Sequence, residues 1–119
     1  MSSAAAETAG FVRRMLEYEG RGWGDQTEAL KRLARECRLS FWTLNNLRIG
    51  RAKTVSADVR DRIRAAFIKN CREHAARLIH EAEAAEKAGR GNDALASIKD
   101  EIRALAARLE AAQGDQAKP

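Results

Sequence analysis

The sequence predicts an all-α protein, and three observations support this prediction. Alanine, arginine, glutamate and leucine are abundant among the 119 residues, and the single proline is the last residue. Apolar residues recur at intervals of three and four, which is the period of a helix face. β-branched residues are few, and no segment alternates apolar and polar residues long enough to specify a sheet. A chain of this length supports one small core plus an extended appendage.

The first helix is expected over residues 9–19. The preceding residues 1–8 are small and polar, which predicts a disordered tail. The helix should end at the glycines of Gly-Arg-Gly-Trp-Gly, residues 20–24. Trp23 within that turn is best interpreted as covering the small core, and a base-stacking or partner-binding role stays open.

Two short helices joined by a tight turn are predicted next, over residues 25–37 and 41–49. Asp25 and Glu28 form an Asp-x-x-Glu capping pattern, Ser40 can cap the second helix, and Gly50 ends it. One apolar stripe lies on each helix. The stripe residues are Leu30, Leu33, Ala34 and Cys37, followed by Leu44 and Leu47. Stripes so close in sequence must face each other.

A long helix is predicted over residues 57–88, capped by Ser56. Only its first half can lie against the preceding helices, through an apolar face. This face comprises Val59, Ile63, Ala66 and Phe67. A break at residues 89–92 then leads to a last helix over residues 93–113, and residues 114–119 are expected to be a disordered tail.

The last helix carries a coiled-coil seam, and the second half of the preceding helix has the same spacing. The seam of the last helix comprises Leu95, Ile98, Ile102, Leu105, Leu109 and Ala112. The matching positions are Ile68, Cys71, Ala75, Leu78, Ala82 and Ala85. The short break allows the two helices to fold back as an antiparallel helical hairpin, with small alanines permitting close approach.

Residues 25–67 resemble the helix-turn-helix of the lambda-repressor and Cro-like superfamily of DNA-binding proteins. Small Ala34 lies where two helix backbones approach, and Leu39, Leu44 and Leu47 match core positions. Arg38 departs from the pattern, because the family usually has glycine at this turn, and a non-glycine residue at positive φ costs about 1 kcal/mol. The expected organisation is a helix-turn-helix DNA-binding domain over residues 9–67 and a helical hairpin, expected to act as a dimerisation element, over residues 68–113.

The net charge of +5 is concentrated on this motif. Residues 25–55 contain seven basic against three acidic residues, whereas the two long helices are almost balanced. Lysine and arginine often merely solvate a helix face, but their concentration on a helix-turn-helix pattern favours phosphate binding.

The helix over residues 41–49 would then enter the major groove of DNA. Its expected base-reading residues are Trp42, Asn45, Asn46 and Ile49. The expected phosphate contacts are Arg38, Ser40, Thr43, Arg48, Arg51 and Lys53. Phe41 and Trp42 cannot both face the groove, because neighbours on a helix differ by about 100°. We expect Phe41 to join the core beside Leu44.

The sequence shows few features of an enzyme or a metal-binding protein. No nucleophile-base set and no phosphate-cradling glycine loop is visible, so we predict no enzyme, no cofactor and no small-molecule substrate. Cys71 and His74 share a helix face but lack the further ligands of a zinc site, so no metal is expected. Free cysteines on apolar faces, together with the lack of a signal peptide or membrane span, predict a reducing cytoplasm.

The sequence thus predicts a sequence-specific double-stranded DNA-binding protein, a repressor-like transcriptional regulator. The last helix is expected to make it a homodimer through Leu95, Ile98, Ile102, Leu105 and Leu109. The alternative is a helical adaptor that docks on another protein through its hairpin and binds nucleic acid only weakly or without sequence preference.

Overall fold

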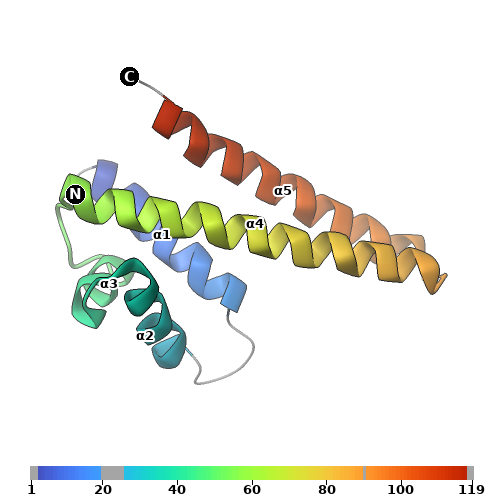
Figure 1. Cartoon of the computed structure of the whole chain (residues 1–119), viewed down its shortest axis with the longest axis horizontal. Coiled ribbons are helices and arrows are strands. Elements are labelled where there is room, and N and C mark those ends of the chain that lie inside the picture. Colours follow the sequence, from blue (N-terminus) through green and yellow to red (C-terminus); the bar gives the residue numbers. More distant parts are fainter. Residues whose placement is uncertain (1–2, 20–25, 90, 118–119) are drawn as a thin grey trace. The chain divides into compact units, whose positions relative to one another are not determined.

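The computed structural model describes residues 3–19, 26–89 and 91–117, and within these residues it contains helices and no strand (Figure 1). The elements are α1 (Ser3–Glu19), α2 (Gln26–Cys37), α3 (Phe41–Arg48), α4 (Ala57–Lys87) and α5 (Asn92–Ala117). The predicted all-α class is therefore confirmed. The chain forms two compact units, residues 1–67 and 68–119, and α4 contributes to both.

The first helix starts earlier than predicted, so the expectation of a disordered tail is wrong for residues 3–8. α1 begins at Ser3, and Ala5, Thr8 and Ala9 are all buried. Alanine has the highest intrinsic helix propensity, which favours this start without any large apolar residue. The buried hydroxyl of Thr8 donates to the carbonyl of Ala4 at 2.7 Å, so its polar group is satisfied.

The predicted glycine-rich end of the first helix, Trp23 and the cap at Asp25 lie outside the described residues. α2 buries the predicted stripe, together with Ala29. A tight turn follows, in which Arg38 adopts φ +58° and the amide of Leu39 donates to the carbonyl of Ala34 at 2.9 Å. The left-handed residue at Arg38 reverses the chain as glycine commonly does at the end of a helix.

The next helix, α3, is capped by Ser40, whose backbone is extended and whose Oγ accepts from the amide of Thr43 at 3.1 Å. α3 ends at Arg48, one residue before the predicted end, and Gly50 follows at φ +79°. Leu44 and Leu47 are buried, and α3 contacts both α1 and α2. These contacts fix which face of α3 is exposed.

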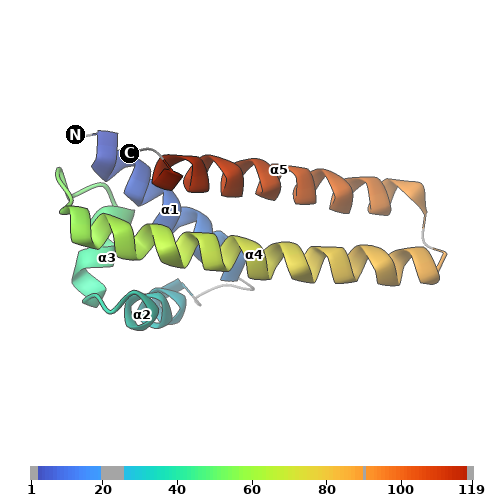
Figure 2. The ribbon, with the colours of Figure 1, turned by 45° about the horizontal axis from the view of Figure 1, so that its top comes forward.

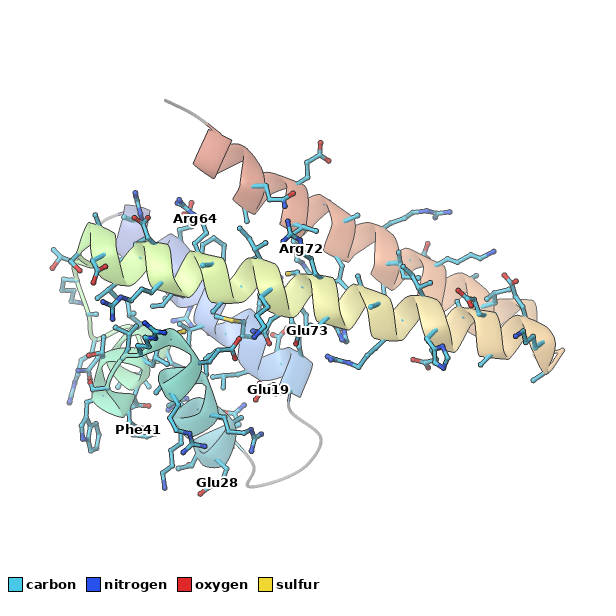
Figure 3. All side chains as sticks on the ribbon, viewed as in Figure 1. Glu19, Glu28, Phe41, Arg64, Arg72 and Glu73 are labelled. Carbon is cyan, nitrogen blue, oxygen red and sulfur yellow. The ribbon has the colours of Figure 1, made fainter. Side chains whose placement is uncertain are left out.

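The beginning of α4 belongs to the same unit as α1, α2 and α3. Phe67 stacks on Phe11 of α1 with ring centroids 4.5 Å apart, and Ile63 is fully buried. Arg64, labelled on α4 in Figure 3, is 6 % exposed and pairs with Glu7 of α1 at 3.5 Å. Apolar stacking and an ion pair between buried Arg64 and exposed Glu7 therefore hold α1 and the start of α4 together.

In the second unit, α5 runs back beside the second half of α4 (Figure 2). An ion pair joins Lys99 of α5 to Glu86 of α4 at 3.9 Å. The residues expected to dimerise differ in burial: Leu105 is buried, whereas Leu95, Ile98, Ile102 and Leu109 are half-buried. α5 continues to Ala117, so the predicted disordered tail is wrong for residues 114–117.

Candidate nucleic-acid interface

One face of α3 presents apolar side chains to solvent. Trp42 is 68 % exposed, Ile49 just after the helix is 48 % exposed, and Asn46 between them is half-buried. The spacing of four and three residues places these side chains on one face. The buried residues Leu44 and Leu47 hold the other side of the helix.

Phe41 lies differently from Trp42, as expected for neighbours on a helix. Phe41 is half-buried on α3 (Figure 3) and lines a small cavity of about 190 Å³ together with Leu30 of α2. Its ring meets Trp42 edge-on, with centroids 5.1 Å apart. This contact supports the exposed indole from one side.

Asn45 lies three residues after Trp42 and four before Ile49, and it is half-buried like Asn46. Its Oδ1 accepts two hydrogen bonds from Arg48, from Nε at 3.2 Å and from Nη2 at 2.8 Å. These bonds use both lone pairs of the amide oxygen. The same oxygen would have to accept from adenine N6 in a bidentate contact. Asn45 also lines the cavity beside Phe41. In this structure the amide oxygen of Asn45 is therefore engaged by Arg48.

The predicted phosphate-contacting hydroxyls take part in the helix cap. Ser40 Oγ lies 2.8 Å from Thr43 Oγ1 and accepts from the Thr43 amide. Each hydroxyl keeps further capacity, because a hydroxyl offers one donor and two acceptor positions. They lie at the amino end of α3, where backbone N–H groups and the helix dipole favour an anion.

Exposed basic side chains surround α3. Arg38 precedes the helix, and Arg51 and Lys53 follow it. In the described parts of the chain none of these three forms an ion pair with a carboxylate. The backbone carbonyl of Arg38 accepts from Arg62 at 3.0 Å, which ties the turn to α4 and leaves the Arg38 side chain in solvent.

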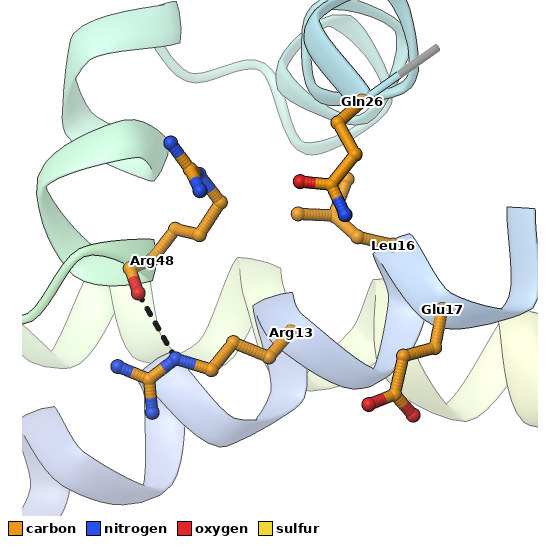
Figure 4. Close-up of a pocket in the computed structure, with 5 residues that line it drawn as sticks. All are labelled: Arg13, Leu16, Glu17, Gln26 and Arg48. Carbon is orange, nitrogen blue, oxygen red and sulfur yellow. Dashed lines mark hydrogen bonds between the residues drawn. The ribbon is translucent and has the colours of Figure 1, made fainter. Parts of the chain in front are cut away.

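Arg13 of α1 is a basic residue near α3 that the sequence did not indicate. Its Nε donates to the carbonyl of Arg48 at 2.9 Å (Figure 4). Both residues line a cavity of about 270 Å³ together with Leu16, Glu17 and Gln26. No local pattern links two residues that are 35 positions apart, so periodicity carries no signal for this contact.

Cys37 and His74, two titratable groups outside this surface, have shifted pKa values. Burial, aided by Glu36, raises the pKa of the Cys37 thiol to about 11, so the nucleophilic thiolate is scarce at neutral pH. Burial and the neighbouring Arg77 lower the pKa of His74. Across residues 3–19, 26–89 and 91–117, no three His, Cys, Asp or Glu side chains are grouped so that they could hold a metal ion.

No helix within the described residues has the length and apolar character needed to cross a membrane. Comparison with protein-family models, curated proteins and solved structures finds no match for the chain.

Proposed function

We propose that the chain binds double-stranded DNA with sequence specificity through the exposed face of α3, as a transcriptional regulator related to the lambda-repressor and Cro-like proteins. The observation that carries this proposal is a short helix, fixed by buried leucines, that exposes Trp42, Asn46 and Ile49. The exposed cations before and after this helix pair with no carboxylate among the described residues. A surface helix flanked by cations suits the major groove and the phosphates along its edges.

The exposed face offers two kinds of contact with base edges. Trp42 and Ile49 can pack on thymine methyl groups, and the Asn46 amide can pair with adenine N6 and N7. Arg38, Arg51 and Lys53 supply charge for phosphates on either side of α3, with Ser40 and Thr43 at its amino end. Readout and anchoring thus come from different residues.

A homodimer completes this proposal. A single reading helix covers few base pairs, whereas two helices related by a two-fold axis contact half-sites about 34 Å apart. The half-buried apolar residues of α5 offer a surface for a second copy. Repression by covering a promoter is what the family resemblance implies.

Selection of bound duplexes from a random pool, followed by sequencing, tests the proposal. We expect an enriched motif with two related half-sites about one helical turn apart. Ile49→Ala should relax the preference at one position per half-site. Ile79→Ala is the matched control, because Ile79 is 47 % exposed on α4 in the other unit and should leave the motif unchanged. A pool without enrichment, or equal effects of the two variants, would overturn specific readout.

The exposed indole and isoleucine also suit a protein partner, which is the second candidate function. Salt separates the two. Binding of a sequence-specific reader to DNA weakens steeply with salt, because it includes phosphate contacts, but the preferred sequence is retained. Apolar docking on a protein depends much less on salt. If one DNA motif is still enriched as the salt concentration rises, the result favours DNA binding over a protein partner.

A further inference from the structure

The carboxyl end of α3 is held by a side chain from α1. The carbonyl of Arg48 is among the last carbonyls of a helix, which have no partner inside the helix. Arg13 Nε donates to this oxygen at 2.9 Å, as Figure 4 shows. A cation at this position is also favoured by the negative end of the helix dipole. Arg13 therefore fixes the end of the reading helix.

Most of the hydrogen-bonding capacity of Arg13 remains after this contact. A guanidinium has five N–H donors, and the bond to Arg48 uses one. Arg13 is exposed and makes no ion pair with the carboxylates that the structure describes. The nearby Glu17 pairs instead with Arg14, at 3.4 Å. The Nη groups of Arg13 therefore have donors left for another acceptor.

The guanidinium also lies beside the turn that leads out of α3. A Cβ placed on Gly50 would be 3.9 Å from Arg13 Nη2, so the side chain passes close to this glycine without a clash. Arg51, an exposed cation, follows immediately. The end of α3 therefore carries two cations from segments far apart in the sequence.

We propose that Arg13 contacts a DNA phosphate with its Nη groups while its Nε holds the carbonyl of Arg48. This inference rests on the proposed function and adds a residue of α1 to the interface. A guanidinium suits a phosphate because its planar donors match two phosphate oxygens. One side chain then joins the DNA backbone directly to the end of α3, so binding register and the placement of Trp42 and Ile49 are coupled.

The test uses the full chain and the duplex most enriched in the selection. The affinity is measured between 50 and 300 mM salt, roughly the range over which phosphate contacts dominate. Arg13→Gln removes the charge, Arg13→Lys keeps the charge but lacks the Nε bond, and Arg14→Gln is the matched control on the same helix. Circular dichroism verifies that each variant is folded.

We expect Arg13→Gln to lower the slope of log affinity against log salt by about 0.9 for each bound copy, the value for one lost phosphate contact, and so by about 1.8 for a homodimer on two half-sites. Arg14→Gln should leave the slope unchanged. Arg13→Lys should restore the slope while discrimination against a mutated half-site falls, because α3 loses its fixed end. This loss of discrimination distinguishes positioning from simple attraction.

Equal slopes for Arg13→Gln and the parent chain, or an equal loss with Arg14→Gln, would overturn the phosphate contact even if the enriched motif is still bound. A parent chain that binds all duplexes alike, with a slope that still depends on Arg13, would instead contradict the proposed specificity and leave the contact standing. The two failures are therefore distinguishable.

Discussion

The left-handed conformation of Arg38 predicts that one substitution will stabilise the first unit. Arg38 has φ +58°, a region that costs an ordinary residue about 1–2 kcal/mol. Glycine adopts it freely but loses about 0.5–1 kcal/mol more chain entropy on folding. The side chain is exposed, and its carbonyl bond to Arg62 involves only backbone atoms of residue 38. Arg38→Gly should therefore raise the free energy of unfolding by about 0.5–1 kcal/mol.

Urea unfolding followed by tryptophan fluorescence measures this effect, because Trp23 and Trp42 both belong to residues 1–67. The expected signature is a higher midpoint with an unchanged slope against urea. Arg38→Ala is the control, since alanine removes the same charge and keeps the strain at positive φ. A glycine variant no more stable than the alanine variant would refute the reasoning. Both variants should weaken DNA binding alike, because both lose one cation near α3.

Two further predictions concern the second unit. Leu105→Ala should lower the free energy of unfolding by about 2–5 kcal/mol, because the side chain is only 2 % exposed. Ile102 is half-buried, and Ile102→Asp should shift the sedimenting species from dimer to monomer. An unchanged dimer for the aspartate variant would argue against the role given to α5. The lowered pKa of His74 means that the unfolded chain binds more protons near pH 6, so stability should decline as pH falls below about 6.5. In His74→Gln this decline should be smaller; an identical pH profile in urea titrations would contradict it.

Local patterns predicted the parts of the fold that local physics determines. The stripe ending at Cys37 is buried, and Ser40 caps α3 as its hydroxyl and position predicted. Arg38 adopts the positive φ that the family resemblance implied for this turn. In each case the cause lies within a few residues, such as a helix period or a side chain that reaches a nearby amide.

The features that local patterns did not predict depend on packing between residues far apart in the sequence. The early start of α1 depends on Ala5 and Ala9, small residues that a search for large apolar residues overlooks. Asn45 and Asn46 are the same residue type and are both half-buried, and only the hydrogen bonds from Arg48 distinguish Asn45. The contact of Arg13 with a backbone carbonyl depends on the fold and leaves no trace in the spacing of side chains.

The ion pair between Lys99 and Glu86 allows a cross-linking test of whether α5 packs on α4 of its own chain or of a second copy. An amine and a carboxylate 3.9 Å apart are close enough for a carbodiimide to join them as an amide with no spacer. Helices joined by a short connection can exchange between two copies while keeping the same contacts. Mass spectrometry of the joined peptides, with one copy isotopically labelled, separates a bond inside one molecule from a bond across two. A cross-link between Lys99 and Glu86 thus shows whether α5 packs within its own chain or against a second copy.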